Sequence, residues 1–381
     1  MAISGALVVV PSAHAGEPHA GKIVYATPTA IESLAPDGTE SELYAVEGHV
    51  PQLLKVSPDG SKVAFLDYIE ASGRRMLVVI DLVSGEARTL AGPKFVVQWV
   101  IGRAGEPEFG AWSNDSSKIA FLSDGGKKRR GLWVVDAGSG KKSRVRAGDV
   151  DQPAWNRTDS KLAFTYFKGT TTSQRIGYVS VVDGKFHQVL DKMVLYGPKW
   201  SPTKDVLVAY DRDGRLFAIN KKNKKTLLSS ASGYVRNFVW LPDGSGVAAA
   251  SCCTKGYVWK LSFLYLDGSI EKVIDLVGVA EEEDYYYYLD PLEFSPDGTE
   301  FAYQEVGFDE IEYESFHNLL YIAPASGASS AIVHNVDWFS YRSWSPDSDA
   351  ILICMNDGLG YLVGDTYTTL EVPHCDADWA P

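Results

Sequence analysis

Apolar runs and turn-forming residues alternate along the whole chain. The runs are short and rich in β-branched and aromatic residues, as in KIAFLS from Lys118 and GLWVVDA from Gly131, and this composition is typical of β-strands. Clusters of Gly, Pro, Asp, Asn and Ser separate them. Between these clusters the apolar residues do not follow helical spacing. The pattern therefore predicts an all-β protein.

Seven segments share one pattern: an aromatic or apolar anchor, a turn similar to Ser-Pro-Asp-Gly, and a second apolar run. They are KVSPDGSKVAFLD from Lys55, AWSNDSSKIAFLS from Ala111, AWNRTDSKLAFTY from Ala154, KWSPTKDVLVAYD from Lys199, VWLPDGSGVAAAS from Val239, EFSPDGTEFAYQE from Glu293 and SWSPDSDAILICM from Ser343. A truncated copy, DWAP, ends at Pro381. The anchors, from Val56 to Trp379, recur about every 46 residues, a period within the range of four-stranded propeller blades.

Each unit is predicted to run from strand a, which ends at the anchor, through the turn to strands b, c and d. The large anchors are interpreted as core residues between neighbouring blades. The first of eight expected b strands, KIVYAT from Lys22, lacks a strand a, whereas the C-terminal PHCDADWAP supplies a strand a without a following blade. The two ends therefore complete one blade, which predicts an eight-bladed β-propeller in one domain, residues 22–381, without exposed edges. Seven blades is the alternative if the N-terminal strands form no proper sheet.

The Trp-Ser-Pro-Asp-Gly-x-x-Ile-Ala-Phe pattern resembles the WD-like repeats of the TolB-like β-propeller family, over nearly the whole chain after Lys22. The resemblance implies a periplasmic propeller that binds partner proteins. TolB-like proteins have six blades and an additional N-terminal α/β domain, however, and this sequence matches neither feature. Prolyl oligopeptidases and dipeptidyl peptidases share the repeat, but the Gly-x-Ser-x-Gly of their hydrolase domain is absent from this sequence. Propeller lyases of pectic polysaccharides resemble the chain at the level of the fold.

Composition and charge narrow the choice of partner. The chain has 381 residues, 45% of them hydrophobic, which suffices for a large core without metal ions. Its net charge of −13 argues against a nucleic-acid partner. The two dense basic runs, KKRR from Lys127 and KKNKK from Lys221, fall in predicted turns and are interpreted as solvated loops.

The N-terminus has features of an export signal. An apolar segment at residues 3–10 is followed by Ala-His-Ala at residues 13–15, which fits the cleavage rule of a signal peptide, although a basic n-region is missing. We expect residues 1–21 to be a signal peptide with a short leader and the protein to be secreted or periplasmic; a buried strand is the alternative. No other stretch is apolar enough to be a transmembrane segment.

The cysteines suit an exported protein with at most two disulfides. Adjacent Cys252 and Cys253 either form a strained vicinal disulfide or remain free as small apolar residues. A disulfide between Cys354 and Cys375 would link the two ends of the last repeat.

In a propeller, the b-to-c and d-to-a connections share one face at the mouth of the channel. That face is predicted to receive the unusual segments of the chain, residues 92–110, 252–257, 279–290, 305–318 and 337–342, and long loops of this kind usually carry binding. A run of four tyrosines is suited to stacking on sugars or to anchoring a protein; the alternative is an ordinary strand that points two of them inward. The predicted binding residues are Tyr285, Tyr286, Tyr287, Tyr288, Trp338, Tyr341 and Arg342.

Catalysis would require polar groups that converge at the channel mouth. The candidates near the starts of strands a are His49, Tyr196, Arg236, Arg342 and His374, with Asp149, Asp151, Asp290 and Asp376. A Tyr or His base beside an Arg that neutralises a carboxylate would suit β-elimination from a uronate sugar. His-Glu-x-x-His, a complete calcium loop and a phosphate-binding glycine loop are all missing, so we expect no metal and no cofactor.

These observations predict an exported, monomeric, TolB-like propeller that acts as a non-enzymatic binding module. Its partner, a protein or a glycan, would lie on the loop-rich face. The alternative is a carbohydrate-active enzyme similar to a polysaccharide lyase, with its site at the channel mouth.

Overall fold

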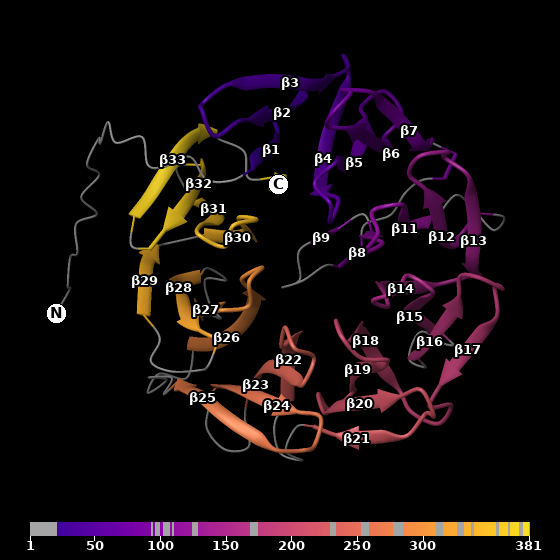
Figure 1. Ribbon diagram of the computed structural model, residues 1–381, viewed down its shortest axis with the longest axis vertical. Coiled ribbons are helices and arrows are strands. Elements are labelled where there is room, and N and C mark those ends of the chain that lie inside the picture. The colour runs from indigo at the N-terminus through magenta and orange to yellow at the C-terminus, as the bar shows by residue number, and fades with distance from the viewer. Residues whose placement is uncertain are drawn as a thin grey trace.

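The protein folds as eight four-stranded antiparallel sheets, the blades, arranged in a ring (Figure 1). The structure is a computed structural model that describes residues 21–380 apart from these gaps: 93, 96–99, 102–106, 109, 124–128, 168–173, 229–233, 253–258, 277–284, 310–314, 326–330, 337–338, 356–357, 365 and 373–375. The side chains of several strand residues beside the gaps are not described. The prediction of an eight-bladed all-β propeller is confirmed, and seven blades is excluded.

From the centre outwards, the strands of each blade are a, b, c and d. Blade 1 contains β34 (Ala377–Ala380), β1 (Lys22–Ala26), β2 (Ala30–Leu34) and β3 (Glu40–Ala45). Blade 2 contains β4 (His49–Val56), β5 (Lys62–Ile69), β6 (Arg74–Asp81) and β7 (Ala87–Ala91). Blade 3 contains β10 (Gly110–Trp112), β11 (Lys118–Ser123), β12 (Gly131–Asp136) and β13 (Lys142–Ala147). Blade 4 contains β14 (Val150–Trp155), β15 (Lys161–Phe167), β16 (Gln174–Ser180) and β17 (Phe186–Val189).

The second half of the ring follows the same order. Blade 5 contains β18 (Leu195–Trp200), β19 (Val206–Asp211), β20 (Leu216–Asn220) and β21 (Lys225–Leu227). Blade 6 contains β22 (Tyr234–Trp240), β23 (Gly246–Cys252), β24 (Trp259–Tyr265) and β25 (Ile270–Leu276). Blade 7 contains β26 (Tyr285–Phe294), β27 (Glu300–Asp309), β28 (Ser315–Pro324) and β29 (Ala331–Val336). Blade 8 contains β30 (Phe339–Trp344), β31 (Ile351–Met355), β32 (Gly358–Val363) and β33 (Thr366–Val372).

Both ends of the chain build blade 1. The C-terminal β34 pairs antiparallel with β1, with Lys22 opposite Ala380 and Ile23 opposite Trp379. The predicted closure is thereby confirmed. Blade 1 therefore has four strands like every other blade, and no blade of the ring is left incomplete.

The Ser-Pro-Asp-Gly turns between strands a and b owe their shape to one residue with a positive φ. Where the fourth turn residue is Ser or Asp, the backbone keeps the same left-handed conformation, at a cost for a side chain with a Cβ, whereas Lys204 in the blade 5 turn does not have a positive φ. The φ angles are 69° at Gly60, 65° at Gly244, 74° at Gly298, 58° at Ser116, 53° at Asp159 and 68° at Ser348. The side chains of Ser116 and Asp159 also form hydrogen bonds to the preceding blade. Ser116 Oγ accepts a hydrogen bond from the backbone amide of Asp59 at 3.0 Å. The Asp159 carboxylate accepts hydrogen bonds from the backbone amides of Asn114 and Asp115, each at 2.9 Å.

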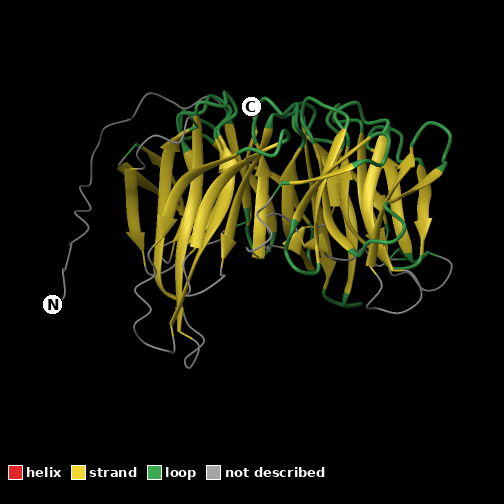
Figure 2. Cartoon of the chain, turned by 90° about the horizontal axis from the view of Figure 1, so that it is seen from below, coloured by secondary structure: helices red, strands yellow, loops and turns green. Residues whose placement is uncertain are grey.

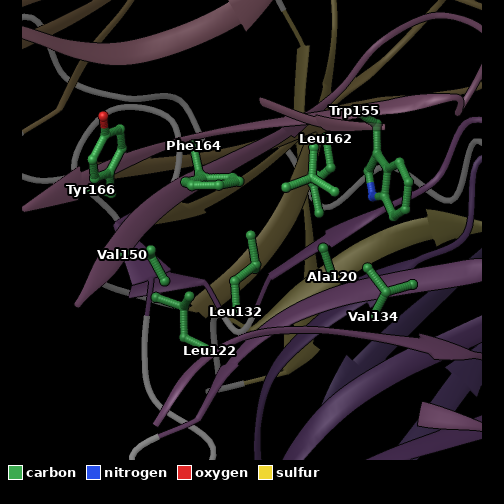
Figure 3. Packing of buried hydrophobic residues seen from close by; sticks show 10 residues of the cluster. Ala120, Leu122, Leu132, Val134, Val150, Trp155, Leu162, Phe164 and Tyr166 are labelled. Carbon is green, nitrogen blue, oxygen red and sulfur yellow. The ribbon is translucent and has the colours of Figure 1, made fainter. Parts of the chain in front are cut away.

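The hydrophobic core is divided among the eight seams between neighbouring blades, and each seam holds one cluster of buried side chains. Figure 3 shows the seam between blades 3 and 4, where Trp155 and Phe164 of blade 4 share a cluster with Leu132 and Val134 of blade 3. The anchor therefore has the predicted core role. Several anchors also fasten the seam, since the Trp155 indole N–H donates to the carbonyl of Ala111 at 3.0 Å.

The connections lie on two opposite faces of the ring. Antiparallel order places the a-to-b and c-to-d turns together, on what we call the short-turn face, and the b-to-c and d-to-a connections on the opposite, loop-rich face. Figure 2 shows the short turns side by side along one broad face. On the loop-rich side, the small sheet of β8 (Val100–Ile101) and β9 (Pro107–Glu108) lies inside the ring and contacts β14 (Figure 1).

Blade 7 corrects one expectation about the loops. Residues 285–290 and most of residues 305–318 were expected in loops, but they belong to β26, β27 and β28, each ten residues long. Strand pairing continues through the tyrosine run, with Tyr285 opposite Asp309 and Tyr288 opposite Val306. A regular partner strand thus satisfies backbone groups that a loop would leave to solvent.

The termini and cysteines are described only in part. Residues 1–20 of the proposed signal segment, residues 1–21, lie outside the described residues, as do Cys253 and Cys375. Cys354 is buried in β31 and disulfide-bonded. The described part of the chain contains no helix with the length and apolarity needed to cross a bilayer.

Candidate functional site

The best-defined polar cluster on the loop-rich face lies at the seam between blades 1 and 2. His49 begins β4 at this face, and Asp67 lies near the end of the neighbouring β5. The Nδ1 atom of His49 is 2.6 Å from Oδ2 of Asp67. Tyr44, at the end of β3, donates its hydroxyl to the same Oδ2 at 2.8 Å. We call these three residues the His49 cluster.

Local strand patterns explain why the three side chains meet. Asp67 continues the face of β5 on which Val63 and Phe65 are buried against blade 1, so it points into the same seam. Its side chain is fully buried, whereas that of His49 is 19% exposed. Burial of a carboxylate is costly unless donors surround it. The Tyr44 hydroxyl and the His49 ring supply two such donors.

The hydrogen bonds determine which ring nitrogen of His49 faces outward. An ionised carboxylate only accepts hydrogen bonds, so Nδ1 carries the proton and Nε2 of the neutral ring keeps its lone pair. Burial and the hydrogen bond to Asp67 raise the pKa of the Tyr44 hydroxyl, which therefore remains a donor at neutral pH. The other oxygen of Asp67, Oδ1, is buried without a hydrogen-bond partner in the described part of the chain.

His49 faces a cavity of about 280 Å³ that opens on the loop-rich face. Its walls come from three connections, β1 to β2, β3 to β4 and β5 to β6, and include Pro28, Thr29, Val46, Glu47, His49, Val50 and Glu70. Glu47 and Glu70 are solvent-exposed. No Lys or Arg is among the described residues that line it. The cavity thus combines apolar walls, one imidazole and two carboxylates.

Of the other predicted catalytic residues, Tyr196 alone has a side chain that the structure describes, and it does not join this cluster. Tyr196 lies in β18 of blade 5, where its ring stacks on that of Tyr210 with centroids 5.7 Å apart. Arg236 and Arg342 lie in β22 and β30, on other blades, and their side chains are not described. His374 lies outside the described residues.

The predicted carboxylates have separate environments. Asp149 forms an ion pair with Arg130, and burial raises the pKa of Asp151. The Asp376 carboxylate accepts a hydrogen bond from the backbone amide of Leu54 at 3.1 Å. Asp376 directly precedes the closing strand β34, so this bond joins the C-terminal end of the chain to blade 2. Asp290 lies in β26, and its side chain is not described.

The predicted binding residues are placed only through their backbones. Tyr285, Tyr286, Tyr287 and Tyr288 open β26, at the end of that strand nearest the loop-rich face, and Tyr341 lies in β30. Their side chains are not described, and Trp338 lies outside the described residues. Within the described residues, no three His, Cys, Asp or Glu side chains gather as they would around a metal ion.

Sequence analysis identified His49 but missed Asp67 and Tyr44. One signal was available: in KVAFLDYI, which forms β5, an Asp interrupts a run of apolar residues that a b strand buries. A buried Asp requires donors, and that requirement points to a partner on a neighbouring strand. Tyr44 carries no such signal, because its neighbours in β3 are ordinary edge-strand residues.

Comparison with known proteins supports the fold. No protein-family model and no curated protein sequence matches the chain. An oligogalacturonate lyase in complex with manganese superposes with a TM-score of 0.57 at 16% identity, over 91% of this chain and 96% of the lyase. Dipeptidyl peptidase 4 from Porphyromonas gingivalis gives 0.58 at 11% identity, over 91% of this chain and 58% of the peptidase. TolB from Acinetobacter baumannii gives 0.42 at 14% identity, over 96% of this chain and 68% of TolB, too low a score to bear on function. The chain is a β-propeller, and these likenesses extend to the fold alone.

Proposed function

We propose that the protein is a non-enzymatic binding module that captures a cationic group in the cavity at the His49 cluster. One observation carries the proposal: an imidazole held by the buried Asp67 and two exposed glutamates share a cavity in which no described cation offsets them. Their combined potential attracts a positive charge. The fold supports this use, since ligand sites of rigid rings usually lie among the connecting loops.

The shape of the cavity narrows the ligand class. Pro28, Val46 and Val50 offer apolar contact for an aliphatic stem, while Glu47 and Glu70 accept hydrogen bonds from a charged head. Lysine and arginine side chains have this form, with an apolar stem and a charged tip. We therefore propose a protein partner that inserts a basic side chain, which agrees with the partner class expected from the sequence.

The tyrosine run remains part of the proposal as a second contact region. β26 and β30 are inner strands that begin on the loop-rich face. The predicted binding residues on and beside them are therefore proposed to contact the same partner: Tyr285, Tyr286, Tyr287, Tyr288, Trp338, Tyr341 and Arg342. Export to the periplasm or the exterior is likewise proposed, on the apolar segment and Ala-His-Ala at the N-terminus.

One observation favours a second candidate function, catalysis. An imidazole oriented by a buried carboxylate is a frequent arrangement for a general base. β-Elimination from a uronate would also require a cation to neutralise the substrate carboxylate. The described lining of this cavity supplies two glutamates instead, which repel a carboxylate, so we rank binding above catalysis.

Titration calorimetry with small probes tests the proposal. N-acetyl-lysine-methylamide and propylguanidinium represent the proposed class, and a galacturonate oligomer represents the alternative. We expect the cations to bind the protein, and Glu70→Gln or His49→Ala to weaken binding about tenfold, equivalent to about 1.4 kcal/mol. Glu42→Gln is the matched control, because Glu42 is exposed on β3 and does not line the cavity.

Each possible result has a defined meaning. Equal binding by wild type, Glu70→Gln and His49→Ala would rule out this cavity as the cation site. Binding of the galacturonate oligomer, with appearance of an unsaturated product that His49→Ala abolishes, would instead establish the lyase alternative.

A further inference from the structure

Charge is distributed unequally around the ring. Residues 111–233, which span blades 3, 4 and 5, contain 23 Lys and Arg against 11 Asp and Glu, a net charge of +12. Residues 234–381, which span blades 6, 7, 8 and the closing strand, contain 5 Lys and Arg against 25 Asp and Glu, a net charge of −20. One side of the disc is therefore basic, although the whole chain is acidic.

The short-turn face shows this division among exposed turn residues. In blades 3, 4 and 5, the a-to-b and c-to-d turns expose Lys141, Arg157, Lys185, Lys204, Lys221 and Lys222. Three acidic side chains on the same turns already have cations within the blades: Asp115 is 4.0 Å from Lys118, Asp183 is 3.1 Å from Lys185, and Asp205 is 2.8 Å from Lys161.

Acidic side chains predominate on the same face of blades 7, 8 and 1. The exposed ones are Asp37, Glu40, Asp297, Asp347 and Asp349. Among the described residues of these three blades, Lys22 is the exposed basic residue on this face. Glu300 shows the effect of this crowding. Burial and the negative charges of Asp297 and Asp349 raise the pKa of its carboxyl. Glu300 is the first residue of strand b in blade 7. The same position is a lysine in blades 2, 3 and 4, namely Lys62, Lys118 and Lys161.

Exposed apolar side chains provide an independent observation. Val83 is 89% exposed in the c-to-d turn of blade 2, and Val182 is 86% exposed in that of blade 4. Ile270, at the first position of β25 in blade 6, is 49% exposed. All three lie on the short-turn face. Such residues lose contact with water when a second surface covers them.

A two-fold axis in this face makes the pattern self-complementary. If the axis crosses blades 2 and 6, it places blades 3, 4 and 5 of one copy over blades 1, 8 and 7 of the other. Turns of the same type then meet, so that Lys141 faces Glu40, Arg157 faces Asp349 and Lys204 faces Glu300. Blades 2 and 6 meet their own copies, which places Val83 against Val83 and Ile270 against Ile270.

We propose that the short-turn face is a dimer interface at which two copies of this chain pair through such a two-fold axis. The contact is isologous, with charge pairs on both sides of the axis and apolar contacts on it. The proposed dimer differs from the monomer expected from the sequence. It does not depend on the proposed function, and it leaves both loop-rich faces outward, so that a partner with repeated sites would bind with increased avidity.

Charge reversal gives the sharpest test. Lys141→Glu, Arg157→Glu and Lys204→Glu together form the basic-reversal variant, and Glu40→Lys, Asp349→Lys and Glu300→Lys together form the acidic-reversal variant. Sedimentation velocity at low ionic strength, about 20 mM, should show wild type as a dimer and each variant alone as a monomer, since each then repels its own copy. An equimolar mixture of the two should form a heterodimer, because every facing pair is again opposite in charge.

Controls separate the position of the charges from their number. Arg74→Glu, Lys192→Glu and Arg212→Glu together change the net charge as much as the basic-reversal variant, but these exposed residues lie on the loop-rich side, Arg74 at the start of β6 and the other two in connections. This control should still dimerise. Val83→Asp should weaken the dimer without disturbing the monomer fold, because that side chain is 89% exposed. Circular dichroism melts confirm that each variant is folded.

The proposal has clear contrary outcomes. A wild type that sediments as a monomer at about 100 µM and low salt, a folded basic-reversal variant that still dimerises, or a mixture of the two reversal variants that fails to associate would each overturn it.

Discussion

The carboxylate of Asp378 accepts a hydrogen bond from the backbone amide of Val56 at 3.0 Å, although 322 residues separate them in the chain. Asp378 lies in β34, the closing strand, and is buried, and the Lys55 ammonium is 3.2 Å from the same carboxylate oxygen. Blade 1 is thereby fastened to blade 2 as well as closed upon itself. Since the His49 cluster lies at this same seam, ring closure also positions the candidate site.

Removal of this carboxylate should loosen the seam. We expect Asp378→Ala to lower the free energy of unfolding by about 1 to 3 kcal/mol, because the Val56 amide is left buried without its acceptor. Urea unfolding followed by tryptophan fluorescence measures the change. Glu42→Ala, at an exposed position of β3, should change it by less than about 0.5 kcal/mol. Equal effects of the two substitutions would contradict this role of Asp378.

Two anchor tryptophans form a matched pair for testing the seam hydrogen bonds. The indole N–H of Trp155 donates to the carbonyl of Ala111, whereas the indole N–H of Trp200 is buried without an acceptor among the described residues. Replacement by phenylalanine removes a ring of similar size in both cases but a hydrogen bond only at Trp155. Trp155→Phe should therefore cost about 1 kcal/mol more than Trp200→Phe in urea unfolding. A larger loss at Trp200 would show that ring packing alone determines the effect.

Asp159 combines a left-handed backbone with hydrogen bonds to the turn of the preceding blade, and substitution can separate these contributions. Asp159→Ala keeps the strain at φ 53° and loses the bonds to the Asn114 and Asp115 amides, so it should destabilise the protein by about 2 kcal/mol. Asp159→Gly loses the same bonds but adopts positive φ freely, and should be less destabilising by about 0.5 to 1 kcal/mol. Thermal unfolding compares the two variants. If alanine is tolerated as well as glycine, backbone strain does not contribute.

Acid should weaken the turns on the short-turn face. Hydrogen bonds from Ser117 lower the pKa of Asp115 to about 2, from the ordinary 3.8 of an aspartate carboxyl, so the folded state holds its ionised form. The stabilisation is complete above the unfolded value and is lost as pH falls from 3.8 towards 2. Melting temperatures of wild type and Asp115→Asn should therefore differ most above pH 4 and converge near pH 2. A constant difference over this range would show that the charge of Asp115 is not responsible.

The fold was predictable because its signals are local and repeated. A strand with one apolar face, a turn with Pro and a positive-φ residue, and an anchor at the strand end are all read from short stretches. The first expected b strand, KIVYAT from Lys22, is found as β1, which begins at Lys22. The unpaired ends, KIVYAT and DWAP, even indicated how the ring closes, because an orphan strand at each end leaves one way to complete a blade.

The loops were predicted less well. The tyrosine run was expected among the connections of the loop-rich face, with an ordinary strand as the alternative. The structure shows that β26 continues through it, because β27 supplies a full set of backbone partners opposite Tyr285 and its neighbours. Pairing with a strand beyond the turn, and not the local pattern, determines where such a strand begins.

The sequence by itself thus determined the all-β class, the eight repeats, the closure by both ends and the two faces between which the connections are divided. Tertiary structure alone decided that His49 meets Asp67 and Tyr44, that the glutamates of two connections share its cavity, and that the charges of eight blades divide the short-turn face into opposite halves. The physical reason is that a repeat specifies each blade through neighbouring residues, whereas these contacts depend on how successive blades are packed around the ring.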